Sequence, residues 1–229
     1  MTAHLERGAL AGIVGGLGYG LFLATVGNSF IAGLETFESG HGHGGPVDAA
    51  LSVGGGALWG LLFGVAVFGI GYYFLEPALP GDGLTARLAL AAAGFLTVSG
   101  APWLVFPPQP PGVEQTLPSA VRLSWYAGSM IAGALVASCC GLAYRRTTTR
   151  RPAVTLFATL CPLALLAVPV VLAPANPTTV DVPGSLVTAY RWTVVFGQLG
   201  LWVLIAAVHT WLGDGDTVVE TEPYAAISD

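Results

Sequence analysis

The sequence predicts an all-α membrane protein, a polytopic bundle of about six transmembrane helices. Hydrophobic residues make up 54% of the 229 residues and charged residues only 9%, whereas a soluble domain carries roughly 25% charged residues. Six apolar runs are long enough to cross about 30 Å of hydrocarbon as helices of about 20 residues. Many of the 32 glycines lie inside these runs, as is common in membrane helices.

The six predicted helices span about residues 8–34, 51–75, 84–106, 119–143, 153–173 and 185–212. Glycines recur at every fourth position from Gly8 to Gly20 in the first helix and from Gly56 to Gly64 in the second. Small residues at this spacing let helix backbones approach closely, so each series is expected to mark a helix–helix contact. The fifth helix contains Pro162 and Pro169 and can be kinked, with neighbouring helices satisfying the freed carbonyls.

These helices are expected to form a single integral-membrane domain, residues 1–212. The remaining residues, 213–229, are acidic, and their composition predicts a disordered tail.

The arginines predict the orientation of the helices, because the chain has no lysine. Four of them crowd the connection between the fourth and fifth helices: Arg145, Arg146, Arg150 and Arg151. The positive-inside rule makes this connection cytoplasmic, and alternation then puts both termini, Arg7 and Arg87 on the same side. Arg122 and Arg191 would lie outside, where each either anchors its helix beside a tryptophan or pairs with an acid of the outer loops.

A proline motif occurs twice in the second half of the chain. The first copy is Pro102, Pro107, Pro110, Val113 and Glu114, and the second, 67 positions later, is Pro169, Pro174, Pro177, Val180 and Asp181. Each copy follows an apolar run. The motif therefore predicts a parallel helical-hairpin repeat, in which helices 3–4 and helices 5–6 are related by an axis along the membrane normal.

The first outer connection holds the densest group of metal-binding residue types: Glu35, Glu38, His41 and His43. Imidazole suits Zn, Cu, Co and Ni, and carboxylates can fill the remaining coordination positions. Glycines beside and between the histidines, at positions 40, 42, 44 and 45, allow the backbone to bend, so that both rings can reach one ion. The alternative interpretation is a solvated polar loop that carries two histidines by chance.

The two acids of the repeat, Glu114 and Asp181, follow proline-rich segments that resist helix formation. One interpretation is a pair of carboxylates at the outer mouth of a central path, where they would also contact the metal. The other is helix capping, because an acid near a helix N-terminus stabilises it by about 0.3–1 kcal/mol.

A few polar residues fall within the predicted spans or at their ends. Gln198 and His209 lie in the sixth helix, where a polar residue is a functional hypothesis by default, although His209 is close enough to the inner boundary to meet water. Glu76 ends the second helix at the same face and can pair with Arg87 or Arg7.

Several segments together resemble the CbtA family of cobalt transporter subunits: LERGALAGIVGGLGYGLF, the E-x-x-E-x-x-H-x-H loop, SVGGGALWGLLFG, YYFLEPALPG and SGAPWLVFPPQPPGVEQ. The resemblance covers most of the chain and looks most like the archaeal branch. It implies cobalt uptake linked to cobalamin synthesis, often beside a small single-span CbtB-type partner with a histidine cluster.

Two functions follow as hypotheses. In the first, the protein moves Co²⁺, or Ni²⁺ or Zn²⁺, inward across the bilayer as a substrate and holds no permanent cofactor. In the second, it is a non-transporting scaffold or assembly subunit of a transporter complex. The sequence shows no Ser-His-Asp set, Walker motif, CxxC pair or basic patch, so neither an enzyme nor nucleic-acid binding is expected. Energy would come from the membrane potential, a gradient or a separate subunit.

Overall fold

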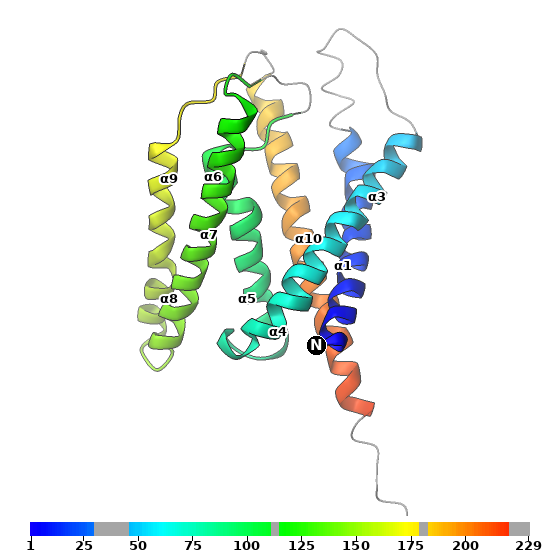
Figure 1. Ribbon diagram of the computed structural model, residues 1–229, viewed down its shortest axis with the longest axis vertical. Coiled ribbons are helices and arrows are strands. Elements are labelled where there is room, and N and C mark those ends of the chain that lie inside the picture. The colour runs from blue at the N-terminus through cyan, green and yellow to red at the C-terminus, as the bar shows by residue number, and fades with distance from the viewer. Residues whose placement is uncertain (30–45, 111–114, 179–182, 220–229) are drawn as a thin grey trace, which may run out of the picture.

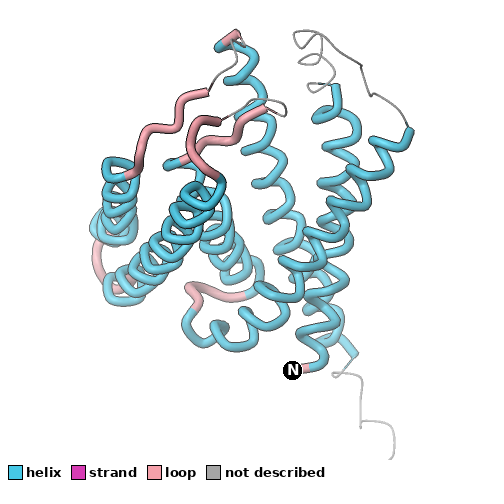
Figure 2. Tube along the Cα trace, turned by 45° about the horizontal axis from the view of Figure 1, so that its top comes forward, coloured by secondary structure: helices cyan, strands magenta, loops and turns pink. Residues whose placement is uncertain are grey.

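The computed structural model describes residues 1–29, 46–110, 115–178 and 183–219 (Figure 1). Within these ranges the chain is almost entirely helical, and six helices are long and apolar enough to cross a membrane. This confirms the predicted fold class. Connecting segments gather at both ends of the bundle, as Figure 2 shows. We call the end with residues 106–110 and 173–178 the loop end, and the end with residues 79–82 and 148–151 the arginine end.

The first three spans change helix type along their length. The first consists of α1, Thr2–Phe22, and a π-helical turn, Leu23–Gly27. The second consists of α3, Pro46–Phe63, a π-helical segment, Gly64–Gly71, α4, Tyr72–Leu75, and a 3-10 turn, Glu76–Ala78. The third consists of α5, Gly83–Phe95, a π-helical turn, Leu96–Gly100, and α6, Ala101–Val105.

The last three spans complete the bundle. The fourth is one unbroken helix, α7, Ser119–Thr147. The fifth consists of α8, Pro152–Leu160, a 3-10 segment, Cys161–Leu166, and α9, Ala167–Leu172. The sixth is α10, Gly184–Val219.

Several helix ends lie beyond their predicted limits, and the two largest differences are at the ends of the chain. The first helix starts at Thr2 and not at Gly8, because backbone hydrogen bonds continue through polar residues that the apolar pattern does not count. The sixth helix continues to Val219, past the position where the acidic tail was expected to begin. Residues 220–229 of that tail lie outside the described residues.

Glycine packing joins the first two spans, as the spacing predicted. A Cβ built on Gly16 would lie 2.5 Å from the carbonyl oxygen of Gly56, and one built on Gly8 would lie 2.5 Å from that of Gly64. Two helix backbones therefore touch directly along α1 and α3. This confirms that the two glycine series are helix–helix contacts.

Proline explains the change of helix type in the third span. Pro102 has no N–H, and its ring displaces the carbonyl four residues earlier, which is that of Val98 in the π-helical turn Leu96–Gly100. The hydroxyl of Tyr126 in α7 donates a hydrogen bond to this carbonyl, 3.0 Å away. A neighbouring helix thus satisfies the freed backbone group, as membrane interiors require.

The main core surrounds α10, which packs on α1 and α5. The largest side chain with almost no exposed surface is Trp202, whose ring stacks on Phe63 with centroids 5.0 Å apart. The fifth span lies at the side of the bundle (Figure 1) and packs mainly on α7. A small cluster, Ala101, Val136 and Leu166, joins the third, fourth and fifth spans.

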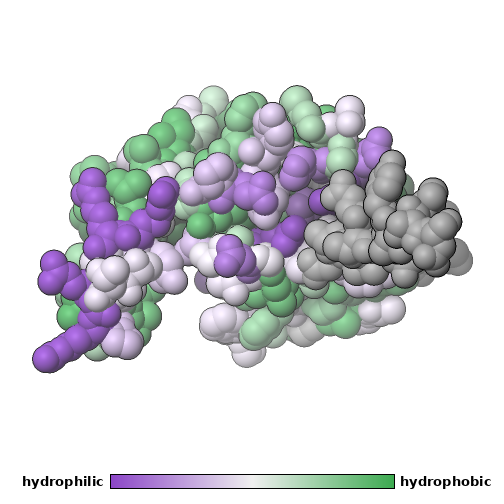
Figure 3. Space-filling model, turned by 90° about the horizontal axis from the view of Figure 1, so that it is seen from below, coloured by the Kyte–Doolittle hydropathy of each residue, from purple (hydrophilic) through white to green (hydrophobic). Residues whose placement is uncertain are grey.

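Hydrophilic residues gather at the arginine end. Figure 3, which views this end directly, shows them spread over its surface. Six of the eight arginines belong to helix ends or turns here, in α1, α5, α7 and the turn before α8: Arg7, Arg87, Arg145, Arg146, Arg150 and Arg151. The charge asymmetry used to predict orientation is therefore present in three dimensions.

Candidate functional site

Two proline-rich segments leave the membrane-spanning helices at the loop end. We call residues 106–110 with 115–118 the first proline loop, and residues 173–178 with Pro183 the second. Phe106 N–H bonds to the Pro102 carbonyl at 2.8 Å, and Ala173 N–H bonds to the Pro169 carbonyl at 3.0 Å. These are the last helical hydrogen bonds of α6 and α9, because the following prolines cannot continue the backbone pattern.

The two proline loops lie side by side. Gln115 and Thr178 form an antiparallel β-bridge, and the Thr116 N–H donates to the Pro177 carbonyl at 3.2 Å. Asn176 reinforces this pairing, because its Nδ2 donates to Gln115 Oε1 at 2.7 Å and its Oδ1 accepts from the Leu117 N–H at 3.2 Å. Segments about sixty residues apart in the sequence are thus held together by backbone and amide hydrogen bonds.

Arg191 of α10 fixes the first proline loop from the other side. Its Nε donates to the Pro108 carbonyl at 3.2 Å, and its Nη2 donates to Gln109 Oε1 at 3.3 Å. The planar guanidinium therefore binds two oxygens of the loop at once. Arg122, the other arginine at this end, donates from Nη2 to Ser119 Oγ of its own helix at 3.1 Å.

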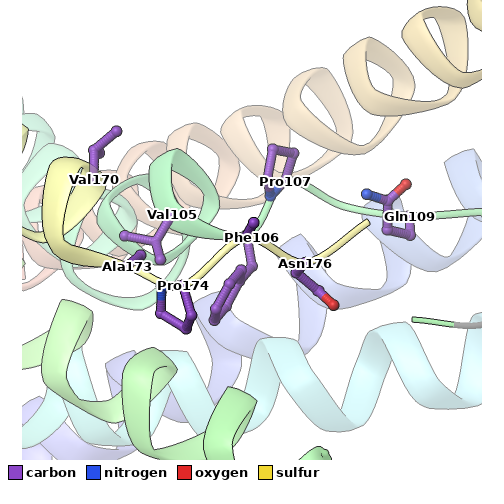
Figure 4. A pocket seen from close by; sticks show the side chains of 9 residues that line it. Val105, Phe106, Pro107, Gln109, Val170, Ala173, Pro174 and Asn176 are labelled. Atoms are coloured by element: carbon purple, nitrogen blue, oxygen red, sulfur yellow. The ribbon is translucent and has the colours of Figure 1, made fainter. Parts of the chain in front are cut away.

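A pocket of about 220 Å³ opens between the two proline loops. Its lining is Val105, Phe106, Pro107, Gln109, Val170, Ala173, Pro174, Ala175 and Asn176. Figure 4 shows the apolar residues Val105, Val170 and Ala173 toward one end and the two amides toward the other. The pocket thus combines an apolar base with oxygen-bearing groups of the kind that hold hard and borderline cations.

The pocket contains pairs of residues that are 67 positions apart, the spacing of the proline motif. Phe106 is paired with Ala173, Pro107 with Pro174, and Gln109 with Asn176. The prolines predicted the repeat, whereas the two amides were not among the predicted site residues. The signal was present, because both amides follow the second proline of their motif by two residues.

All six predicted metal-binding residues lie outside the described residues: Glu35, Glu38, His41, His43, Glu114 and Asp181. The structure places their described neighbours at the loop end. Gln115 and Thr178, which flank the repeat acids, form the bridge between the loops. Near the first connection, Ser52 Oγ donates to Asn28 Oδ1 at 3.2 Å. Among the residues that the structure describes, His, Cys, Asp and Glu form no group of three that could hold a metal ion.

A second polar group lies at the arginine end and differs from expectation. His209 has no exposed surface, which rules out the alternative that it meets water at the inner boundary. It accepts a hydrogen bond at Nδ1 from Arg87 Nε at 3.0 Å. Glu76 accepts a hydrogen bond from the Tyr72 hydroxyl at 3.0 Å. The sequence did not indicate the hydrogen bond between Arg87 and His209, because these residues lie on different helices, α5 and α10.

The fold and the loop-end pocket together define a class, the multi-pass integral membrane proteins with a polar opening at one face. The comparisons with known proteins go one step further. The family described as "Probable cobalt transporter subunit (CbtA)" matches residues 1–214, and the chain belongs to this family. No curated protein and no solved structure matches the chain.

Proposed function

We propose that the protein carries Co²⁺ inward across the cell membrane, with the loop end outside and both termini in the cytoplasm. Family membership supports the transported ion. The single structural observation that carries the proposal is the pairing of the two proline loops around a polar pocket. The paired residues Gln115 and Thr178 are close in sequence to the two repeat acids, which supports a shared role for these acids.

The two repeat acids are neighbours in sequence of the bridged residues. Glu114 directly precedes Gln115, and Asp181 comes three residues after Thr178. This nearness in sequence supports the proposal that the two carboxylates receive one ion in turn or share it.

In the proposed order of steps, four residues of the first outer connection capture the cation: Glu35, Glu38, His41 and His43. Glu114 and Asp181 then pass it to the pocket. The matched spacing of Gln109 and Asn176 supports the hairpin repeat as the origin of this paired site. We also propose a single membrane domain, residues 1–212, with an acidic cytoplasmic tail. A small single-span CbtB-type subunit would be a partner, and cobalamin synthesis would be the use of the metal.

The membrane potential is sufficient as an energy source. Moving one charge through 100 mV is worth about 2.3 kcal/mol, so a divalent cation gains about 4.6 kcal/mol. Since about 1.4 kcal/mol corresponds to a factor of ten, this supports a concentration ratio above about a thousandfold.

A metal-uptake experiment tests the proposal. Cells with and without the protein are compared for accumulation of Co²⁺, Ni²⁺ and Zn²⁺ at several concentrations. We expect Co²⁺ accumulation to depend on the protein. Equal accumulation of all three metals in both cells contradicts transport and favours the second candidate, a scaffold, for which the direct backbone packing of α1 on α3 is the supporting observation.

Variants then test the two parts of the path. His41→Ala with His43→Ala should raise the Co²⁺ concentration for half-maximal uptake by about 10–100-fold. Glu114→Gln with Asp181→Asn should lower the maximal rate more than either single change does. Glu220→Gln with Glu222→Gln, which removes as much charge from the tail, is the matched control and should leave uptake unchanged.

The structural support of the pocket can be tested separately. Arg191→Lys keeps the charge but loses the planar pair of donors that reaches Pro108 and Gln109, so uptake should fall several-fold. Arg122→Lys is the matched control, because Arg122 donates its hydrogen bond to Ser119 of its own helix. Equal effects of the two changes would indicate that only surface charge matters.

The proposed orientation has its own test. A reporter fused after Trp211 should be found in the cytoplasm, since the four arginines between α7 and α8 predict that side. A reporter found outside would place the loop end in the cytoplasm and so contradict inward transport from the loop end.

A further inference from the structure

At the arginine end, side chains from four helices meet around one buried imidazole. His209 of α10 has no exposed surface and Arg87 of α5 is 8% exposed. The His209 ring lies beside Phe68 and Tyr72, with ring centroids 5.6 and 5.1 Å away. His4 of α1 approaches the same tyrosine, with centroids 6.0 Å apart.

The hydrogen bond between Arg87 and His209 fixes the state of the imidazole. A guanidinium is always protonated and can only donate, so Nδ1 of His209 must present its lone pair. The ring is therefore neutral. A neutral imidazole nitrogen with an available lone pair is also the form in which histidine binds transition metals. Arg87 thus occupies, with its own positive charge, the position that a metal cation would take.

Two nitrogens of this group have no hydrogen-bond partner despite their burial. They are Nε2 of His209 and Nδ1 of His4. The Arg87 hydrogen bond accounts for Nδ1 of His209, but it leaves Nε2 of the same ring without an explanation. A buried polar atom without a partner calls for a specific explanation.

Arg87 has a second place to bind within the same group. Its guanidinium carbon lies 5.0 Å from the centroid of the Tyr72 ring. The hydroxyl of that tyrosine donates to Glu76 Oε1, so a carboxylate lies beyond the far end of the ring. The turn between Glu76 and α5 contains Gly81 with φ of +72°, and α5 begins at Gly83 with φ of +52°; such positions can absorb the backbone changes of a hinge.

We infer that His209 is a second cation-binding residue, at the exit of the path, and that Arg87 closes this site in the structure. This inference rests on the proposed transport function for its ligand, a divalent transition-metal cation. When Arg87 leaves His209 and moves to Glu76, the lone pair of Nδ1 is released and the arginine charge is neutralised. His4 lies close enough to contribute a second imidazole as the helices rearrange.

The arrangement in which Arg87 binds His209, the closed state, puts positive charge beside the buried imidazole at the arginine end. Gly213 of α10 lies beside both arginines, since a Cβ built on it would lie 2.8 Å from Arg87 Nη2 and 3.6 Å from Arg7 Nη1. The Arg87 guanidinium bound at the imidazole repels cations. The closed arrangement therefore opposes the return of metal from the arginine end, and only removal of Arg87 makes the imidazole available.

The test measures Co²⁺ binding to the purified full chain, by equilibrium dialysis and by the visible ligand-field absorption of the bound ion. The background variant is His41→Ala with His43→Ala, which removes the histidines of the outer loop. Adding Arg87→Met, which keeps the length of the side chain but not its charge or donors, should produce one additional bound Co²⁺. Adding His209→Phe to that protein should abolish the gain or weaken the binding by about 10–100-fold.

Arg87→Lys is the matched control, because it retains the charge and should give no additional Co²⁺. If Arg87→Met gives none either in a monodisperse protein, or if His209→Phe leaves the added ion in place, the inference is wrong. A second variant remains informative if Arg87→Met does not fold. Glu76→Gln removes the alternative partner of Arg87 and should slow Co²⁺ uptake several-fold without changing the half-maximal concentration; unchanged uptake overturns the gate.

These outcomes are separable from failure of the transport proposal. Wild-type cells that take up no Co²⁺ would contradict transport, whereas the binding measurement on purified protein reports on His209 and Arg87 alone.

Discussion

The first and second spans are held together very differently from the fourth and fifth. Along α1 and α3 the contact is backbone against backbone at glycines, whereas α8 and α9 present most of their side chains outward. In the most apolar window of each span, 28% of the residues are buried in the first and second spans but only 6% in the fifth. Yet the fifth span is the most hydrophobic of the six.

This contrast separates two roles of apolar residues in a membrane protein. Hydrophobicity places a helix in the bilayer but does not select its neighbour, because lipid chains are as apolar as leucine. Close approach at small residues does select a neighbour, because it increases van der Waals contact between helices. The glycines therefore determine which spans pack firmly, and the fifth span lacks them.

The largest effect should come from filling the glycine contact. A Cβ built on Gly60 would lie 2.6 Å from the backbone nitrogen of Gly16, and backbone cannot move aside as a side chain can. We expect Gly60→Leu to lower the free energy of unfolding by about 3 kcal/mol or more. The measurement is thermal unfolding of the purified protein, followed by tryptophan fluorescence.

Gly55→Leu is the matched control for this change. It lies in the same helix, but a Cβ built there meets nothing within 4 Å. Its effect should stay within about 0.5 kcal/mol. Equal destabilisation by the two changes would mean that helix propensity, and not the contact of α1 with α3, decides the result.

The sequence predicted this contact and the six spans because both depend on local spacing. Glycine at every fourth position and apolar runs of about twenty residues can be read without knowing the fold. The changes of helix type could not be predicted so directly, since the carbonyl that Pro102 frees is satisfied by Tyr126 from another helix. Long-range partners of this kind leave no periodic signal.

The same distinction applies to the candidate sites. The proline motif indicated that residues near Glu114 and Asp181 correspond, and the structure shows their described neighbours paired. The pairing of Arg87 with His209 could not be found from the sequence, because the two residues are 122 positions apart and neither belongs to a motif. Their contact follows only from the packing of α10 on α5.

An intermediate effect is expected at the small cluster that attaches the fifth span. Leu166 is the buried hydrophobic residue that this span contributes to it. Leu166→Ala should destabilise the protein by about 1–2 kcal/mol, less than the 2–5 kcal/mol typical of soluble cores, because lipid also offers the lost leucine an apolar environment. The quantity to measure is the unfolding temperature of the purified protein in detergent.

The neighbouring residue provides the control for that prediction. Leu165 is 56% exposed, so Leu165→Ala removes the same atoms from the outward surface of the span. It should change the unfolding temperature much less than Leu166→Ala does. If both changes have equal effects, the fifth span is not attached through the cluster with Ala101 and Val136.

The smallest effect is expected on the outer face of the fifth span. Phe157 is 75% exposed and borders an apolar groove with Leu156, Leu160 and Cys161. Lipid chains can fill the space that Phe157→Ala would leave. The free energy of unfolding of the isolated chain, followed through its unfolding temperature, should therefore change by no more than about 0.5 kcal/mol. Phe157→Leu, which keeps an apolar side chain, should have the same unfolding temperature as Phe157→Ala. A loss well above 1 kcal/mol that grows as the protein is concentrated would break the comparison, because the fifth span would then be held by another protein surface and not by lipid.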